Sequence, residues 1–416
     1  MSSAINKATV FRQGRVFDGT TFLNGPHDVE IRNGTIEAVR PSPESLDEDS
    51  SMTVIDCSRK TVLPGMIDAH VHLLVTSANP VQNALDPFSL AYYRSVNNAR
   101  AMLESGITSA RDLAGADAGL KESIELGVTL GPRLAIAIGG MSITGGHGDN
   151  WLRSGVKLHA VNDSPGKPNA IADGREEVRK VAREMFRAGA DVIKICATGG
   201  VMSMNDHPDH SQFSVEEIQV IVEEATARGS YVAAHAIGTN GIKNALRAGV
   251  RSIEHAIFVD DEAIQMMLDA DAYMVPTLTA PRQVLEHGHV GIGLPEGMMT
   301  KARGVIDQHL RNFSKAVDAG VKIAMGSDAG VGPHGRSLDE LPLMAEGGMS
   351  LEAVLAAATS VGAELLPEEW KVGHLRPSYT ADVLVVDSHL DSTSQLASIP
   401  KDLSQVWKSG RLVFAR

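Results

Sequence analysis

The chain has few cysteines, fewer basic than acidic side chains and no long apolar run. Its 416 residues include only Cys57 and Cys196, too few for a disulfide framework, and Cys196 lies in an apolar, strand-like run. Lys and Arg number 38 against 51 Asp and Glu, and the resulting charge of −13 would repel phosphate backbones and anionic lipid surfaces. We therefore expect neither nucleic acid nor a membrane surface as a partner.

Membrane insertion and export have no signal in the sequence. A membrane helix needs a run of about eighteen apolar residues, and the chain has none. The opening MSSAINKATVFRQGR has no apolar core followed by a small-residue cleavage site. We expect a cytoplasmic protein, unless a leader was removed before this sequence begins.

The composition is that of a globular protein. Hydrophobic residues make up 43% and charged residues 21%, and the 40 glycines and 18 prolines suit many tight turns between strands and helices. The length fits one large barrel with an appendage as well as two or three ordinary domains.

Both ends of the chain are typical of short strands joined by turns. Residues 1–62 contain a hairpin signal at Asn33-Gly34, and residues 371–416 contain a similar turn at Ser409-Gly410. No helical period appears in residues 1–62, and the C-terminal segment returns to the same style of short strands. We expect the two segments to combine into one small β-sandwich domain.

The middle segment, residues 63–370, alternates apolar strand-like runs with helical stretches, a pattern that predicts a buried parallel sheet. The eight runs are MIDAHVHL, ITSARDL, RLAIAIGG, DVIKICATGG, YVAAHA, RSIEHA, YMVPTL and VKIAMGSDAG. The predicted fold class is therefore α/β, a (β/α)8 TIM-type barrel with the small sandwich attached. In such a barrel the chemistry lies at the C-terminal ends of the strands.

Polar side chains stand at those strand ends. In GMIDAHVHLL, His70 and His72 are two residues apart, so on a strand both imidazoles point to the same face. The complete set at the strand ends is His70, His72, Lys194, His235, His255 and Asp328. A single histidine in an apolar run is more often a hydrogen-bonded core residue than a ligand. Six such groups at one end of a barrel instead favour zinc or another divalent ion.

Lys194 needs a separate explanation. A charged lysine inside a barrel beside metal cations is disfavoured by burial and by like charge. Deprotonation resolves the conflict, and so does carbamylation by carbon dioxide, which turns the amine into a carboxylate that bridges two metals. The alternative is a lysine that extends to the barrel rim.

These motifs carry a family resemblance. PGMIDAHVHL, IKI at Lys194, AAHA, EHA, GSDAG and the closing ADVLVVD resemble the amidohydrolase superfamily. The similar branch groups imidazolonepropionase-like enzymes with prolidase-like carboxypeptidases and ochratoxin A-hydrolysing amidohydrolases, and the resemblance covers nearly the whole chain.

The resemblance implies a binuclear metal centre, with zinc as the expected metal. His70 and His72 would bind the more buried ion, His235 and His255 the second ion, and Asp328 would contact the first. Lys194, as N6-carboxylysine, would bridge both. No ligand position departs from the family pattern. Related proteins are often oligomers, so a homo-oligomer is expected by analogy.

Two metals would hold a hydroxide that attacks the carbonyl carbon of the substrate, while one metal polarises the carbonyl oxygen. Asp328 would take the proton and return it to the leaving nitrogen as general base and acid.

Three further side chains are candidate substrate contacts. His147 and Arg153 lie in the long loop GGMSITGGHGDNWLRSG, and Tyr231 stands four residues before His235. His147, as a catalytic group, and Tyr231 would hold an α-carboxylate or polarise the scissile carbonyl. The alternatives are a surface histidine and a core aromatic residue. The sequence also contains further loop histidines that we interpret as solvated: His207, His210, His287 and His289.

The leading interpretation is a metallo-carboxypeptidase or dipeptidase that releases the C-terminal amino acid from dipeptides or N-acyl amino acids, including amides of the ochratoxin A type. Hydrolysis of a cyclic amide or an ester on the same centre is the second enzyme hypothesis. A non-catalytic oligomeric scaffold is the third, and the complete ligand set argues against it.

Overall fold

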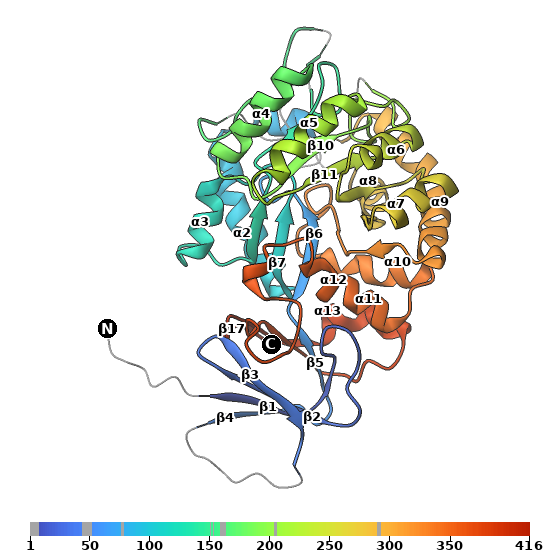
Figure 1. Cartoon of the computed structure of the whole chain (residues 1–416). Helices are drawn as coiled ribbons and strands as arrows, with labels where there is room; N and C mark the ends of the chain where they lie inside the picture. Colours follow the sequence, from blue (N-terminus) through green and yellow to red (C-terminus); the bar gives the residue numbers. More distant parts are fainter. Residues whose placement is uncertain are drawn as a thin grey trace.

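The computed structural model describes residues 8–43, 52–75, 79–149, 151–152, 154–158, 164–203, 206–288 and 293–416. The chain forms a mixed α/β structure with two parts (Figure 1). A smaller part made of strands contains the described residues near both ends of the chain. The larger part has strands in its interior and helices around them.

One eight-stranded sheet joins the two ends of the chain. Its strands follow the order β17-β16-β15-β5-β1-β2-β3, and β4 pairs with β1. They are β1 (Thr9–Val16), β2 (His27–Arg32), β3 (Thr35–Pro41), β4 (Thr53–Asp56), β5 (Thr61–Pro64), β15 (Val383–Val386), β16 (Leu403–Lys408) and β17 (Arg411–Ala415). Strand β5 pairs in parallel with β1 and antiparallel with β15, so it connects the N-terminal and C-terminal strands.

The two predicted turns lie in this sheet. Asn33 and Gly34, with φ of 53° and 83°, connect β2 to β3, and Ser409 and Gly410 connect β16 to β17. Positive φ at both central residues is the geometry that matches a hairpin to the twist of its strands. The boundary predicted at residue 62 falls within β5, and the sandwich packing of the sheet stays a prediction.

The larger part contains parallel strands in two sheets, ordered β14-β13-β12-β11-β10-β9 and β6-β7-β8. The strands are β6 (Met66–Val71), β7 (Ile107–Asp112), β8 (Arg133–Ile136), β9 (Gly140–Met141), β10 (Ile193–Cys196), β11 (Val232–Ala236), β12 (Ser252–His255), β13 (Tyr273–Val275) and β14 (Lys322–Ile323). Each of the eight apolar runs contains a strand, and the third is divided into β8 and β9. The alternation of strands and helices is thus confirmed.

Main-chain hydrogen bonds connect the two parallel sheets at both sides. On one side Ala69 donates to the carbonyl oxygen of Met325 at 2.8 Å, and Asp328 donates to that of His70 at 2.8 Å. On the other side Asp191, which precedes β10, donates to the carbonyl oxygen of Ile136 at 2.8 Å. The ends of β6 and β14 are therefore neighbours, although about 250 residues separate them in the sequence.

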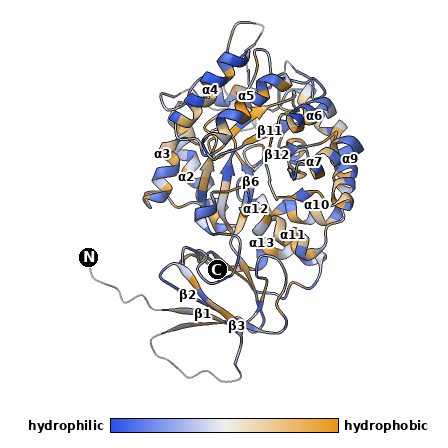
Figure 2. Cartoon of the chain, viewed as in Figure 1, coloured by the Kyte–Doolittle hydropathy of each residue, from blue (hydrophilic) through white to orange (hydrophobic). Residues whose placement is uncertain are grey.

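Helices cover the outside of these strands, with hydrophilic residues on their outer faces and hydrophobic residues toward the interior (Figure 2). They are α1 (Pro80–Leu85), α2 (Leu90–Glu104), α3 (Ala118–Glu125), α4 (Arg175–Arg187), α5 (Val215–Thr226), α6 (Thr239–Arg247), α7 (Asp261–Asp269), α8 (Thr279–His287), α9 (Glu296–Ala319), α10 (Glu340–Glu346), α11 (Leu351–Ala357), α12 (Ser360–Ala363) and α13 (Ile399–Asp402). Three short 3-10 helices complete the set: η1 (Ser337–Asp339), η2 (Glu368–Trp370) and η3 (Thr393–Ser398).

Local sequence explains where some helices begin and end. Ser214 and Glu217 form a capping box at the start of α5, and Gly320, with φ of 86°, ends α9 in the left-handed conformation. Within the described ranges, no helix has both the length and the apolar character that crossing a membrane requires.

Candidate active site

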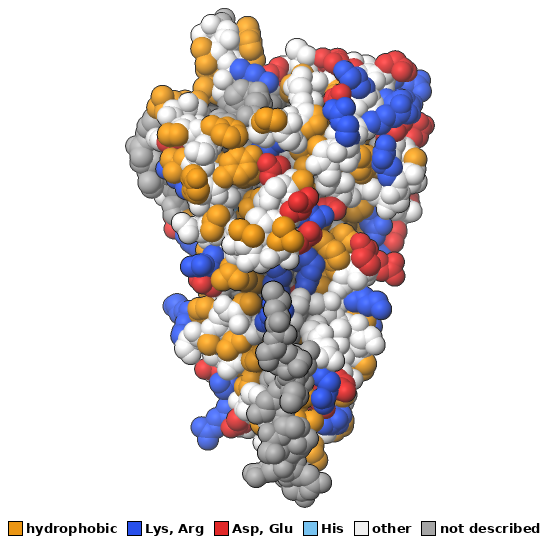
Figure 3. Space-filling model, turned by 90° about the vertical axis from the view of Figure 1, so that its left-hand side faces the viewer, with side chains coloured by type: hydrophobic (Ala, Val, Ile, Leu, Met, Phe, Trp, Pro, Cys, Tyr) orange, Lys and Arg blue, Asp and Glu red, His pale blue; other side chains and the backbone are white. Residues whose placement is uncertain are grey.

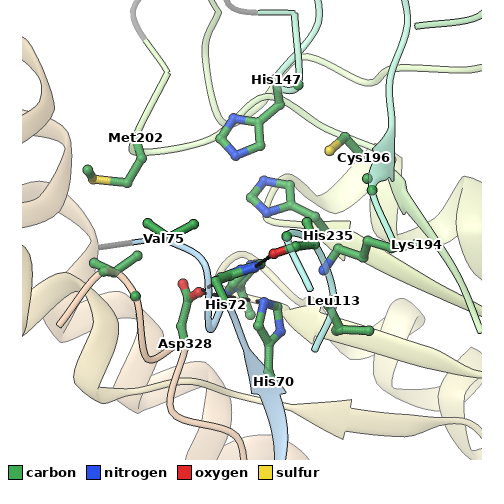
Figure 4. A pocket seen from close by; sticks show the side chains of 18 of the residues that line it. His70, His72, Val75, Leu113, His147, Lys194, Cys196, Met202, His235 and Asp328 are labelled. Atoms are coloured by element: carbon green, nitrogen blue, oxygen red, sulfur yellow. Dashed lines mark hydrogen bonds and ion pairs between the residues drawn. The ribbon is translucent and has the colours of Figure 1, made fainter. Parts of the chain in front are cut away.

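A cavity of about 340 Å³ opens at the C-terminal ends of the parallel strands (Figure 4). The six predicted ligands all line it: His70, His72, Lys194, His235, His255 and Asp328. They come from β6, β10, β11 and β12 and from the segments that follow β6 and β14. Parallel strands end at the same side of a barrel-type sheet, which explains why residues so far apart in sequence meet here.

His70, His72 and Asp328 form the most compact group. Nε2 of His72 lies 3.1 Å from Oδ1 of Asp328, and Nε2 of His70 lies 3.6 Å from the same oxygen. The potential ligand atoms of the three side chains all lie within 4.8 Å of one another. This spacing suits one metal ion bound by two imidazoles and a carboxylate.

The rings of the four ligand histidines form a continuous series of neighbouring pairs. The centroid separations are 5.2 Å for His70 and His72, 4.9 Å for His70 and His255, and 4.6 Å for His235 and His255. Burial, together with the positive charge of neighbouring groups, holds the pKa of His70, His235 and His255 well below the ordinary value. These three rings are therefore neutral, the form of imidazole that binds metals.

His72 differs from the other three histidines. Burial acts to lower its pKa, but Asp328 outweighs that effect and raises it. A cation placed between His72 and Asp328 would take over the role of the proton, so that the neutral ring could coordinate.

The second nitrogen of each ligand histidine is held by a neighbour. Nδ1 of His70 lies 2.8 Å from Oε2 of Glu254, and Nδ1 of His72 lies 2.9 Å from the carbonyl oxygen of Ala114. Both acceptors are oxygens without a proton, so Nδ1 donates, and in the neutral ring Nε2 keeps its lone pair toward the cavity. Such outer contacts fix the tautomer and the orientation of metal ligands.

Glu254 and Arg111 form a buried ion pair beneath the cavity. Nη2 of Arg111 donates to Oε1 of Glu254 at 2.8 Å, and the side chains of both residues are 0% exposed. Arg111 also donates to the carbonyl oxygen of Ala69 at 2.7 Å and to Oγ of Ser252 at 3.0 Å. Nothing in the sequence distinguishes these two residues from other charged side chains, so they were not predicted.

Lys194 is buried in the wall of the cavity, with 4% of its surface exposed. Its Nζ has no hydrogen-bond partner among the described residues. Burial lowers the pKa of Lys194, and the carboxylate of Glu254 acts in the opposite direction. A buried amine without an acceptor is unfavourable unless a missing group completes its surroundings.

These observations test whether divalent metal ions fit the site. Imidazole nitrogens and carboxylate oxygens are ligands that zinc accepts, and the compact group has the spacing for one ion. The unpartnered Nζ of Lys194 is the group that carbamylation would convert into a further ligand. The donor set therefore fits a divalent metal ion at this compact group.

Three residues beside the cavity have unusual backbone conformations. The φ angles of His255, Thr277 and Asp328 are 70°, 54° and 56°. A positive φ costs a residue other than glycine about 1–3 kcal/mol, and such conformations concentrate at functional sites. Their occurrence at or beyond the ends of three adjacent strands, β12, β13 and β14, supports this cavity as the functional site.

His147 also lines the cavity, as predicted for a substrate contact. Its ring lies above that of His235 (Figure 4). Arg153 lies outside the described residues, and so does His289. His207 and His210 are exposed and are not among the residues that line the cavity.

Tyr231 does not lie in the cavity, contrary to our expectation. Its hydroxyl donates to the carbonyl oxygen of Leu365 at 2.6 Å and accepts from Nη1 of Arg111 at 3.1 Å. A strand rises about 3.3 Å per residue, so a residue four positions before His235 lies about 13 Å away along the strand. Tyr231 is therefore not among the described residues that line the cavity, and its ring packs against a hydrophobic cluster of the core.

The chain belongs to the amidohydrolase family. The family profile matches residues 61–413, which include all six candidate ligands. Proteins of this family generally use divalent metal ions, and the structural neighbours imply a TIM-barrel-type fold for the larger part.

Three relatives define the branch. Ochratoxinase of Aspergillus niger is 36% identical over 367 residues, covering 84% of this chain and 75% of the relative. Imidazolonepropionase of Geobacillus kaustophilus is 26% identical over 386 residues, covering 86% of this chain and 82% of the relative. A crystal structure of a prolidase complexed with N-methylphosphonate-L-proline is 35% identical, with a TM-score of 0.89 over 98% of this chain and 100% of that chain. The motif resemblance is thereby confirmed: the chain is a hydrolase of the prolidase-like branch.

Proposed function

We propose that this protein is a binuclear metal-dependent amidohydrolase that cleaves the amide bond of dipeptides or N-acyl amino acids and releases the C-terminal amino acid. The observation that carries the proposal is the cavity at the strand ends, which all six candidate ligands line and where the amine of Lys194 is buried without a partner.

The residues divide between two ions in this proposal. His70, His72 and Asp328 would hold one ion, His235 and His255 would hold the other, and Lys194, as N6-carboxylysine, would supply a carboxylate to both. The lowered pKa of Lys194 supports the last assignment, because only a neutral amine adds to carbon dioxide. Bound divalent ions, zinc by expectation, supply Lewis acidity that brings the pKa of water close to neutrality.

Asp328 is the proposed general base and acid. Its carboxylate contacts both His72 and His70, so it faces the centre where water would be activated. It accepts a proton from the attacking water and returns the proton to the leaving nitrogen. His147 is proposed to contact the substrate from the opposite side, at its carbonyl oxygen or its carboxylate.

The walls of the cavity support an amino-acid substrate with an apolar side chain. Val201, Ile237, Ile257 and Val284 line one wall and belong to one hydrophobic cluster. The basic side chains of Lys157 and Lys167 also line the cavity, whereas Asp328 is the only acidic side chain among its described lining residues. The excess of basic over acidic side chains in the lining favours a substrate with a free carboxylate.

The relatives narrow the substrate class. One is named for ochratoxin hydrolysis, and another is a prolidase that was crystallised with a proline derivative. N-acyl-phenylalanines, including amides of the ochratoxin A type, and Xaa-Pro dipeptides are therefore the first substrates to test.

The test compares each substrate with a free and with an amidated C-terminus on zinc-loaded enzyme. We expect cleavage only of the free acids, because the cavity supplies cations for a carboxylate. Cleavage of neither form by enzyme that holds its metals would contradict the peptidase proposal and would favour lactam or ester hydrolysis, the candidate that the imidazolonepropionase relative supports.

We also propose that the parallel sheets close into one (β/α)8 barrel and that the protein forms homo-oligomers. The main-chain hydrogen bonds between the sheets at both sides support closure. Exposed apolar side chains on the face that carries α2 and α3 support self-association (Figure 3). They include Tyr93, Leu126 and Val128, which are 73%, 78% and 79% exposed.

A further inference from the structure

His147 reaches the cavity from a loop and not from a strand. Its ring stacks on that of His235, with centroids 4.2 Å apart and planes at 15° (Figure 4). Loop side chains change rotamer readily unless other contacts hold them. The contacts that hold His147 come from residues 199–203 and from Asp206, which we call the anchoring segment.

Ser203 connects His147 to Asp206. Its Oγ lies 3.0 Å from Nδ1 of His147 and forms a short contact with Oδ1 of Asp206. The one proton of the hydroxyl faces two acceptors, Oδ1 of Asp206 and, at 3.2 Å, the carbonyl oxygen of Gly200, so the Ser203 oxygen accepts from His147. Oδ2 of Asp206 lies 3.5 Å from the same nitrogen. These contacts require a proton on Nδ1 of His147.

The carboxylate of Asp206 is buried and ionised. Its side chain is 5% exposed, and it accepts hydrogen bonds from the backbone N–H of Gly200 at 3.3 Å and from Nε2 of Gln212 at 3.3 Å. Burial acts to raise the pKa of Asp206, but the interactions with His147 and Ser203 outweigh burial and hold the pKa below its ordinary value.

Lys301 of α9 fixes the anchoring segment. Its Nζ donates to the carbonyl oxygens of Gly200 at 3.0 Å, Ser203 at 3.0 Å and Asp206 at 2.8 Å. An ammonium group has three protons, and all three are used here. The long helix therefore holds the backbone on both sides of Ser203 in place.

Gly200 brings this backbone against the ring of His147. A Cβ atom at Gly200 would lie 2.2 Å from Cε1 of His147, closer than two carbon atoms can approach. Only glycine leaves the ring its stacked position. The ring is thus confined between His235 and the anchoring segment.

We propose that Asp206 is a positioning residue that acts through Ser203 to keep a proton on Nδ1 of His147 and to turn Nε2 toward the substrate. Among the described residues, Nε2 of His147 has no hydrogen-bond partner, so it is the nitrogen available to a ligand in the cavity. The role of Asp206 in turnover rests on the proposed function. Its effect on the tautomer and the ring position of His147 does not.

The direct test is nitrogen-15 NMR of the histidine side chains in zinc-loaded protein, with His147→Gln to assign the signal. We expect a protonated Nδ1 in the wild-type protein, whether the ring is neutral or charged. In Asp206→Asn the amide donates to Ser203, the hydroxyl turns toward Nδ1, and the proton moves to Nε2. An unprotonated Nδ1 in the wild-type protein, or no change in Asp206→Asn, would overturn the proposal.

Kinetics provide a second test on a substrate that the wild-type enzyme cleaves. We expect Asp206→Asn to lower kcat by about 10-fold to 10⁴-fold with the same zinc content and thermal stability, because the wrong tautomer presents the wrong nitrogen. Combined with His147→Gln, Asp206→Asn should cost nothing further. Additive losses would contradict action through His147.

Two further variants separate the position of the His147 ring from a general effect of charge in this loop. Gly200→Ala changes no charge and should lower kcat as Asp206→Asn does, because its methyl group displaces the ring of His147. Asp209→Asn removes an exposed carboxylate of the same loop and should leave both the NMR signal and kcat unchanged. If the wild-type enzyme cleaves none of the proposed substrates, the proposed function fails, and the NMR experiment alone decides the role of Asp206.

Discussion

Oε2 of Glu254 lies 2.8 Å from Nδ1 of His70, and both side chains are completely buried. The opposite oxygen of the same carboxylate is paired with Arg111. A buried ion pair contributes little to stability on its own, since desolvation of two charges offsets their attraction. We interpret this pair as the group that orients His70 toward a metal.

Replacing Glu254 by Gln should weaken zinc binding by about 10-fold to 100-fold, the usual effect of losing an outer contact to a metal ligand. The amide can donate to Nδ1 as well as accept from it, so it no longer selects the tautomer of His70. Competition with a chelator measures the affinity. Glu216→Gln, on the exposed face of α5, is the matched control, and equal affinities for both variants would show that Glu254 does not act on the metal.

Replacing Asp328 by Asn should leave less than about a tenth of the activity, because general acid–base groups contribute about 10²–10⁴-fold. The variant should still bind metal in part through His70 and His72. Initial rates at equal zinc content measure the effect, with the exposed Asp318→Asn as the control. If Asp328→Asn keeps more than a tenth of the rate, another group moves the proton.

Removing carbon dioxide should impair reconstitution of the metal-free protein with zinc, and added bicarbonate should restore it. The reason is that the proposed centre needs Lys194 as a carbamate, and the buried, unpartnered amine has a lowered pKa that favours its reaction with carbon dioxide. Bound zinc is measured after gel filtration, with and without bicarbonate. A Lys194→Met variant that binds as much zinc as the wild-type protein would exclude a bridging role.

Tyr231→Phe should leave KM unchanged and lower the free energy of unfolding by about 1 kcal/mol, because the variant loses hydrogen bonds to Leu365 and Arg111 within the core. Substrate kinetics and denaturant unfolding measure the two effects separately. A large rise in KM with an unchanged free energy of unfolding would mean that Tyr231 contacts the substrate.

Glu340 should make stability depend on pH. Its carboxylate accepts hydrogen bonds from the backbone of Leu278 and Thr279 at the start of α8, and burial raises its pKa from 4.5 to about 7. The folded protein therefore binds this proton more tightly than the unfolded chain. The stabilisation of the folded protein by this proton is complete below pH 4.5 and is lost as the pH rises through 7. At about 1.4 kcal/mol per pKa unit, the free energy of unfolding changes by about 3 kcal/mol.

The comparison with Glu340→Gln isolates this contribution, since the amide does not titrate. Denaturant unfolding of both proteins between pH 4.5 and pH 7 should show a stability difference that changes with pH in the direction given. A constant difference across that range would mean that Glu340 has an ordinary pKa.

The sequence predicted those features that follow from periodicity. His70 and His72 share a face because strand side chains alternate, and the ends of parallel strands meet, so six scattered residues line one cavity. Tyr231 was expected in the cavity because it shares a strand face with His235. The alternation of side chains gives the face of a strand but not the distance along the strand. Glu254, Arg111 and Asp206 act through contacts between distant segments, and no local pattern predicts such contacts.

Titration of metal-free protein with zinc, followed by hydrolysis of N-acyl-phenylalanine, tests the central claim most directly. We expect no activity without metal and a rate that reaches its plateau at two zinc ions per chain. Full activity of the metal-free protein, or a plateau at one zinc ion, would contradict a binuclear metal-dependent amidohydrolase.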